Sequence, residues 1–155
     1  MDVNIENVTI DRLDELMVWR EIVLREVFSL PSEADISGLL AENRRYYEAA
    51  LTTGQHTACF AIGDHHIVGC GGICWQQEMP SPDNPQGTCG YLMNIYTLPQ
   101  PRGGGVGGKI VQWLIAEANR RGTGKIYLEA SKKGASLYRK LGFEDLNGYM
   151  KLKEG

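Results

Sequence analysis

The sequence predicts one α/β domain with a mixed sheet, spanning residues 1–155. Strand-like and helical apolar patterns alternate along the whole chain. A glycine-rich turn stands between one of the strand-like segments and the most clearly helical one. The length of 155 residues suits one domain, and no repeat, low-complexity segment or linker composition divides it.

The first half of the chain predicts a strand, two helices and a hairpin. Residues 3–10 are rich in β-branched side chains, as in a strand. Apolar residues then recur at helical spacing over 13–30 and again over 35–53, where Gly54 ends the second helix. Residues 56–62 and 66–75 flank a short turn, the pattern of an antiparallel hairpin.

The second half predicts a surface loop followed by alternating strands and helices. Three prolines break residues 77–88, and a loop of this length is often functional. The expected elements after it are a strand, a helix, a short strand, a helix closed by Gly142, and a final strand or hairpin, at 89–98, 106–121, 125–130, 132–141 and 143–152.

The charge and the N-terminal sequence exclude several classes of protein. The formal net charge is −3 and no cluster of Lys and Arg could follow a phosphate backbone, so no nucleic acid partner is expected. No basic and apolar leader and no run of eighteen apolar residues is present, so no membrane partner is expected and we expect a cytoplasmic protein. The four cysteines lack zinc-site spacing and are expected to be reduced and buried: Cys59, Cys70, Cys74 and Cys89.

The segment Pro99–Lys109 carries five glycines among the six positions 103–108. Each glycine inside a helix costs about 1 kcal/mol relative to alanine. Close approach of backbone N–H groups to an anion accounts for that cost, because a helix N-terminus has unpaired N–H groups and a positive dipole end. The alternative is a flexible turn without a ligand.

The turn does not fit the two commonest phosphate-binding motifs. It lacks the Gly-Lys-Ser/Thr ending of a P-loop. It also lacks the βαβ unit and the acidic residue about twenty positions on that mark a dinucleotide site. Another carrier of pyrophosphate is therefore indicated.

Two blocks of the sequence resemble the GNAT superfamily of N-acetyltransferases. The segment Arg102–Gly107 resembles the acetyl-CoA motif of that family, and Asn94–Pro99 before it resembles the family's fourth strand. The second block is Leu137–Phe143, about thirty residues on. The resemblance covers nearly the whole chain. It implies a strand, two helices and three strands, followed by a helix, a strand, a helix and one or two final strands. It also implies that the sheet splays between the strands at 89–98 and 125–130.

The resemblance implies acetyl-CoA as the cofactor and no metal. The pyrophosphate would lie on the turn, and the pantetheine arm would pair with the strand before it like an added strand. Tyr138 matches the tyrosine that in many members protonates the departing thiolate, a role that suits a phenol with a pKa near 10. The implied cofactor-binding residues are Ile95, Tyr96, Thr97, Arg102, Gly103, Gly104, Gly105, Val106, Gly107 and Gly108.

The sequence departs from the family at two places. Ser131 stands where many members carry an asparagine that contacts the cofactor, so we expect Ser131 in that position of the site. The strand at 89–98 has no Glu or Asp where some members keep a general base. Glu129 is the candidate base, and the other candidates are Glu78, His56 and His66, while Trp75, Tyr91 and Tyr47 are candidates for an acceptor pocket.

The expected activity is direct attack of an amine on the thioester of acetyl-CoA, with no covalent enzyme intermediate. In this scheme backbone N–H groups of the strand at 89–98 polarise the carbonyl group. The expected partner is an amine of a small molecule or peptide, and a homodimer is one possibility for the oligomeric state. Two alternatives stay open: a non-catalytic acyl-CoA binding or regulatory domain, and a structural domain whose glycines form only a turn.

Overall fold

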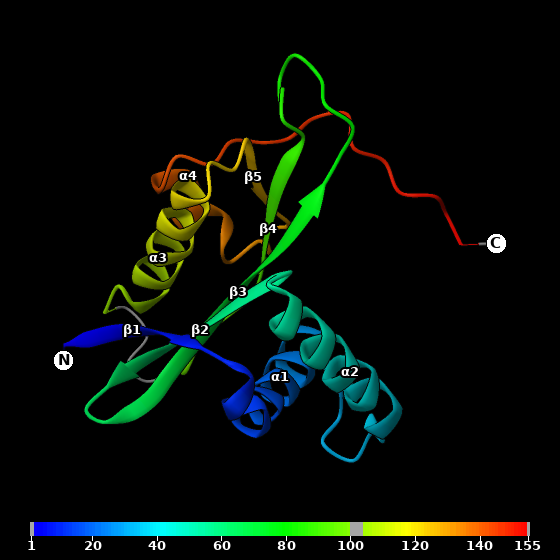
Figure 1. Ribbon diagram of the computed structural model, residues 1–155. Coiled ribbons are helices and arrows are strands. Elements are labelled where there is room, and N and C mark those ends of the chain that lie inside the picture. The colour runs from blue at the N-terminus through cyan, green and yellow to red at the C-terminus, as the bar shows by residue number, and fades with distance from the viewer. Residues whose placement is uncertain (1, 100–103, 155) are drawn as a thin grey trace.

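The computed structural model describes residues 2–99 and 104–154 as a five-stranded sheet with helices on both faces (Figure 1). The strand order is β1-β2-β3-β4-β5, with β4 and β5 parallel and the other neighbours antiparallel. The elements are β1 (Val3–Val8), a 3-10 turn (Ile10–Arg12), α1 (Leu13–Val27), α2 (Ser37–Thr53), β2 (His56–Gly63), β3 (His66–Gln77), β4 (Thr88–Thr97), α3 (Val106–Arg120), β5 (Lys125–Leu128) and α4 (Ala135–Lys140).

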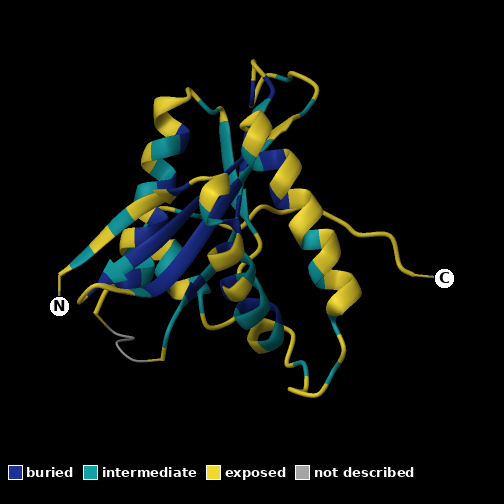
Figure 2. Cartoon of the chain, turned by 60° about the horizontal axis from the view of Figure 1, so that its bottom comes forward, coloured by how far each residue is buried: buried dark blue, intermediate teal, exposed yellow. Residues whose placement is uncertain are grey.

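The sheet separates two apolar clusters, and its central strands contain long runs of buried residues (Figure 2). Alternate residues of a strand point to opposite faces. In β2, Ala58 and Phe60 therefore join the cluster with α1 and α2, whereas Cys59 and Ala61 join the cluster with α3. This alternation explains why β2 is buried along nearly its whole length.

Helix α3 lies directly on the middle of the sheet. A Cβ atom added at Gly71 of β3 would lie 2.5 Å from Cγ2 of Ile110, so only a glycine lets the helix come this close. Ile110, Val111 and Leu114 are fully buried on the inner side of the helix. The position of α3 fixes where its glycine-rich N-terminus lies relative to β4.

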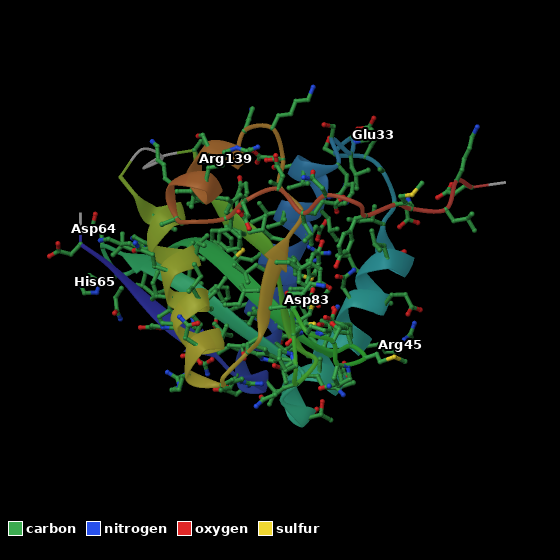
Figure 3. All side chains as sticks on the ribbon, turned by 90° about the horizontal axis from the view of Figure 1, so that it is seen from above. Glu33, Arg45, Asp64, His65, Asp83 and Arg139 are labelled. Atoms are coloured by element: carbon green, nitrogen blue, oxygen red, sulfur yellow. The ribbon has the colours of Figure 1, made fainter. Side chains whose placement is uncertain are left out.

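The β2–β3 hairpin turns at Asp64 and His65, two residues with φ of 50° and 64°. Both central residues of a type I′ turn need positive φ, so this turn matches the twist of the hairpin. Figure 3 shows both side chains at the edge of the molecule, directed outward, and both residues are exposed.

The prediction of a final strand or hairpin over 143–152 is wrong for the described residues, which end at 154 without another strand. In Figure 1 the chain beyond α4 crosses above β5 and then runs away from the domain. Glycines at 142 and 148 take positive φ and interrupt an extended course. The apolar residues Leu146, Met150 and Leu152 are exposed, so their side chains do not pack this segment against the sheet as a strand.

Two further expectations need correction. The last predicted helix is shorter than 132–141, because residues 131–134 form a turn in which the Gly134 N–H donates to Oγ of Ser131 at 3.1 Å. The four cysteines are free as predicted, but Cys74 is only partly buried. In the described part of the chain, no helix is long and apolar enough to cross a membrane.

Candidate functional site

The N-terminus of α3 has no side-chain cap from its N-cap residue, Gly105, whose backbone has φ 77° and ψ 14°. Among the described residues, no side chain is recorded as accepting a hydrogen bond from the first turn. A Cβ atom added at Gly105 would meet no atom of a described residue within 4 Å. Two predicted site residues, Arg102 and Gly103, lie outside the described residues.

The first turn of α3 offers several backbone N–H groups to a ligand. The first hydrogen bond back along the helix runs from the Lys109 N–H to the Gly105 carbonyl, at 3.1 Å. The N–H groups of Val106, Gly107 and Gly108 come before it and have no acceptor within the helix. Together with the helix dipole, they form a site for an anion such as phosphate.

Gly107 is the point where three predicted segments of the site meet. A Cβ atom there would lie 3.3 Å from Cδ2 of Leu137 in α4 and 3.9 Å from Cγ2 of Thr97 at the end of β4. The helix start, the strand end and α4 are therefore neighbours, as the site requires. Leu137 also lies 3.7 Å from a Cβ position at Gly108, so these two glycines serve helix packing as well as any anion.

Tyr138 follows Leu137 on α4 and is half-buried. Its ring packs edge-on against Phe143, with ring centroids 5.9 Å apart. Its hydroxyl makes no hydrogen bond to another described residue, and burial raises the pKa of this phenol. Tyr138 therefore keeps its proton at neutral pH and has it free to donate.

The other predicted residues differ in what their side chains do. Ser131 is exposed and its Oγ accepts from the Gly134 N–H, so its hydroxyl already supports the turn before α4. Glu129 is exposed just beyond β5 and makes no hydrogen bond or ion pair with the described residues. Burial raises the pKa of Tyr91 on β4, and the negative charge of Glu129 raises it further. The Glu129 carboxylate therefore lies near that tyrosine.

The end of β4 can offer its backbone rather than its side chains. The Tyr96 side chain is buried, and its hydroxyl donates to Oε2 of Glu26 on α1 at 2.5 Å. Ile95 packs into the α3 cluster. The pairs between β4 and β5 end at Leu92 with Leu128, where β5 itself ends, so β4 continues to Thr97 without a β5 residue paired beside it.

A polar network lies on the α1–α2 face of β4, and no motif in the sequence predicted it. Arg20 of α1 donates to the side-chain oxygens of Asn43, at 2.8 Å, and of Asn94, at 2.9 Å. Asn94 in turn donates to the Tyr47 hydroxyl at 3.4 Å. Asn94 has φ 59°. The one sequence signal for this conformation is the residue type, because asparagine adopts positive φ more readily than most non-glycine residues.

The remaining candidate bases are engaged or remote. His56 is buried, and its Nδ1 lies 2.8 Å from the Tyr46 hydroxyl. Glu78 forms an ion pair with Lys125 at 2.9 Å, and hydrogen bonds from Lys125 and Asn84 lower the pKa of its carboxyl. His66 is exposed in the first position of β3.

The candidate acceptor-pocket aromatics are packed against other groups. The Trp75 Nε1 donates to Oγ1 of Thr57, and the Arg121 guanidinium lies 4.0 Å from the centre of the Trp75 ring. Tyr47 is buried in the α1–α2 cluster. Tyr91 packs against Tyr127, with ring centroids 4.9 Å apart.

A groove of about 950 Å³ lies beside β5. It is lined by β5, by α4 including Tyr138, and by the chain from 141 to 149, and none of the described glycine-turn residues lines it. It occupies the side of β5 where the predicted last strand would pair. Among the described residues, no group of three His, Cys, Asp or Glu side chains could hold a metal ion.

Comparison with known sequences supports the same family over most of the chain. The sequence profile of the Acetyltransferase (GNAT) family matches residues 24–143. Two curated relatives are thialysine N-epsilon-acetyltransferases, 32% identical over 89 residues in Sus scrofa and 39% identical over 59 residues in Mus musculus. These matches cover 44% and 36% of this chain and only 52% and 35% of those proteins, so the chain spans about half or less of the curated relatives it matches.

Solved structures agree with the fold over nearly the full length. A predicted acetyltransferase from Clostridium acetobutylicum, crystallised with acetyl-CoA, is 28% identical and superimposes with a TM-score of 0.86, covering 98% of this chain and 96% of that one. A GCN5-related N-acetyltransferase from Ralstonia eutropha reaches 0.83 at 23% identity, covering 99% of this chain and 100% of that one, and supports the fold alone.

The profile match includes β4, the glycine-rich start of α3 and the α4 tyrosine, the segments that meet around Gly107. It also covers well over half of the 155 residues. This chain therefore belongs to the Acetyltransferase (GNAT) family.

Proposed function

We propose that this protein transfers an acetyl group from acetyl-CoA to the amine of a small molecule or peptide. The observation that carries the proposal is the meeting of Thr97, Gly107 and Leu137 at one point. It places a helix N-terminus that no described side chain caps beside the end of β4, with the Tyr138 phenol on the neighbouring α4. Family membership supports the same chemistry.

The described residues fit the pyrophosphate of coenzyme A. Among the described residues, no atom lies within 4 Å of a Cβ position at Gly105, and no side chain is recorded as taking up the N–H groups of the first turn. The anchor would consist of the N–H groups from Gly104 to Gly108, with Arg102 and Gly103 beyond the described residues. Bound acetyl-CoA would supply a thioester, an acyl group already activated toward an amine.

The protein's own groups would position and stabilise the reacting atoms. In the proposed site, backbone groups of β4 around Ile95 to Thr97 hold the arm of the cofactor, and the Ile95 N–H polarises the carbonyl group. Burial raises the pKa of the Tyr138 hydroxyl, so this group keeps its proton at neutral pH. It donates that proton to the leaving sulfur. The exposed Glu129 carboxylate accepts the proton of the amine, directly or through water.

The relatives suggest which amines to test first. The two curated relatives are named for thialysine, an amino acid with a side-chain amine, although this chain spans only part of their length. Amino acids with side-chain amines and short peptides therefore belong beside other primary amines in a first panel.

The test is release of free thiol from acetyl-CoA by the purified protein over this amine panel. We expect one class of amine to accelerate release well above the rate with acetyl-CoA alone. Binding of acetyl-CoA without accelerated release for any amine would instead favour a non-catalytic acyl-CoA binding domain. Absence of acetyl-CoA binding would refute both readings.

A further inference from the structure

Strand β4 carries a β-bulge next to the proposed thioester site. In the β3–β4 ladder, Gly72 pairs with Met93 and Cys70 pairs with Tyr96, so β4 has one more residue than β3 between these pairs. A β-bulge inserts one residue, changes the direction of the strand and is over-represented beside active sites. This bulge immediately precedes the residues that would hold the acetyl-CoA arm.

The side chains show which residue is the extra one. The Met93 sulfur lies 3.2 Å from Cys74, and Asn94 contacts Arg20. Both contacts lie on the face covered by α1 and α2, so two successive side chains point the same way. Alternation resumes at once, because Ile95 packs into the α3 cluster and Tyr96 returns to the α1–α2 cluster. A strand without the bulge would present these last two residues to the opposite faces.

Asn94 takes the conformation that makes the bulge. Its φ of 59° lies in the left-handed region, which asparagine enters more readily than most non-glycine residues. Its side chain bridges two helices: Oδ1 accepts from Arg20 of α1 at 2.9 Å, and Nδ2 donates to the Tyr47 hydroxyl of α2 at 3.4 Å. Its carbonyl oxygen accepts from the Cys70 thiol at 3.3 Å.

We propose that Asn94 is a positioning residue of the acetyltransferase: its positive-φ backbone forms the bulge that sets the direction of the Ile95 backbone N–H, and its contacts with Arg20 and Tyr47 support that conformation. The inference rests on the proposed function, because that N–H group is assigned to the thioester carbonyl. Asn94 itself touches no reacting atom. It acts through the backbone conformation that its side chain stabilises, so residues that adopt positive φ easily can replace it in part.

The decisive comparison is between Asn94→Ala and Asn94→Gly. Alanine removes the side-chain contacts and resists positive φ, whereas glycine removes the same contacts but accepts positive φ. We expect kcat to fall by at least about tenfold in Asn94→Ala and to stay within roughly threefold of wild type in Asn94→Gly, because misplacing reacting groups by about 1 Å can cost 10²-fold. Affinity for CoA should fall less than kcat in Asn94→Ala, since the pyrophosphate anchor lies at α3.

Asp64→Ala is the matched control. Asp64 also has positive φ, at 50°, but it lies in the exposed β2–β3 turn, whose side chains point away from the molecule in Figure 3. This variant should lose stability from the same kind of backbone strain while keeping kcat. Unfolding midpoints measured for all three variants separate a loss of folded protein from a loss of positioning.

A second readout needs no acceptor amine. In protein with isotope-labelled isoleucine, the Ile95 amide resonance should respond differently to acetyl-CoA and to CoA, because only acetyl-CoA carries the thioester carbonyl. We expect that difference in wild type and Asn94→Gly and its loss in Asn94→Ala.

Two results would overturn the positioning role. One is an Asn94→Ala variant with wild-type kcat and an unchanged Ile95 response. The other is an equal loss in the glycine and alanine variants, which would assign a direct role to the side-chain amide. Failure of wild-type protein to bind acetyl-CoA would instead refute the proposed function itself.

Discussion

At Gly105 the backbone takes a left-handed conformation with φ 77°, and no atom of a described residue lies within 4 Å of where a Cβ atom would be. A side chain there would be strained by its conformation and would project into the volume assigned to the pyrophosphate. Gly122, just beyond the end of the same helix, has φ 70° and an equally open Cβ position. The two residues therefore separate backbone strain from ligand binding.

Gly105→Val should weaken CoA binding by tenfold or more, which is about 1.4 kcal/mol. Titration calorimetry of wild type, Gly105→Val and Gly122→Val measures it. Both variants should lose stability, since left-handed backbone costs an L-residue roughly 1–2 kcal/mol. Only the Gly105 variant should lose affinity; equal affinities in two folded variants would refute the anchor at α3.

Tyr138→Phe should lower turnover while leaving acetyl-CoA affinity and stability close to wild type. The change keeps the ring that packs on Phe143 and removes a hydroxyl that has no partner among the described residues. A positioned acid contributes about 10²- to 10⁴-fold, and water can replace a half-buried one, so the expected loss is near the lower end of that range.

Tyr149→Phe is the control for losing a phenol elsewhere. The Tyr149 hydroxyl accepts from Lys125 Nζ at 2.6 Å, on the chain beyond α4, and has no part in the proposed chemistry. It should leave kcat unchanged. If Tyr138→Phe turned over within about twofold of wild type, Tyr138 would be removed from the mechanism as its acid.

At the scale of elements, α2 packs against the first residue of β2, His56, whose side chain is neutral at neutral pH. His56 packs edge-on against Tyr46 and Tyr47, with ring centroids 5.3 and 5.5 Å away. Burial, with a smaller contribution from the charge of Arg20, lowers the pKa of His56 to about 4. In the unfolded chain a histidine has a pKa of about 6.5.

Between those two pKa values the unfolded state binds the proton more readily, so His56 reduces stability as the pH falls from about 6.5 to about 4. His56→Phe keeps the aromatic packing and removes the titrating group. Urea midpoints at neutral and mildly acidic pH should therefore fall less in this variant than in wild type. Parallel losses in both proteins would show that other groups account for the acid sensitivity.

Helices and strands with a regular apolar pattern were predicted well from the sequence. The final strand over 143–152, which would need a partner strand far away in the chain, was not. Helix α3 has a regular apolar face, and its start at Val106 follows the glycines, so its position was visible in the sequence. The last strand or hairpin, predicted over 143–152, would need a partner strand, and the large apolar side chains Leu146, Tyr149, Met150 and Leu152 are exposed instead of packing against the sheet.

The same distinction holds inside the site. The glycine-rich turn before α3 could be identified from the sequence, because several glycines at a helix start cost stability and therefore indicate a function. The contact of Leu137 with Gly107 and the Arg20–Asn94–Tyr47 network join residues far apart in the chain, and no local pattern reports such contacts. The sequence also could not show that Ser131 supports the turn before α4.

At the scale of the whole molecule, the sheet carries the proposed cofactor site on parts that only the fold brings together. A ligand that contacts β4, α3 and α4 at once should stabilise all three. Acetyl-CoA at 100 times its dissociation constant should add about 2.7 kcal/mol to the free energy of unfolding, which for 155 residues raises the melting temperature by roughly 5–10 °C. CoA should act similarly, and a larger shift with NAD or ATP would contradict the assignment of the cofactor.

The central claim is that the acetyl group of acetyl-CoA ends on an amine. Its most direct test uses acetyl-CoA labelled in the acetyl group together with the best amine of the panel, with both products quantified. The account predicts one labelled amide for each thiol released, and no label on the protein. Label retained on the protein, or thiol release without a labelled amide, would contradict direct transfer from acetyl-CoA to the amine.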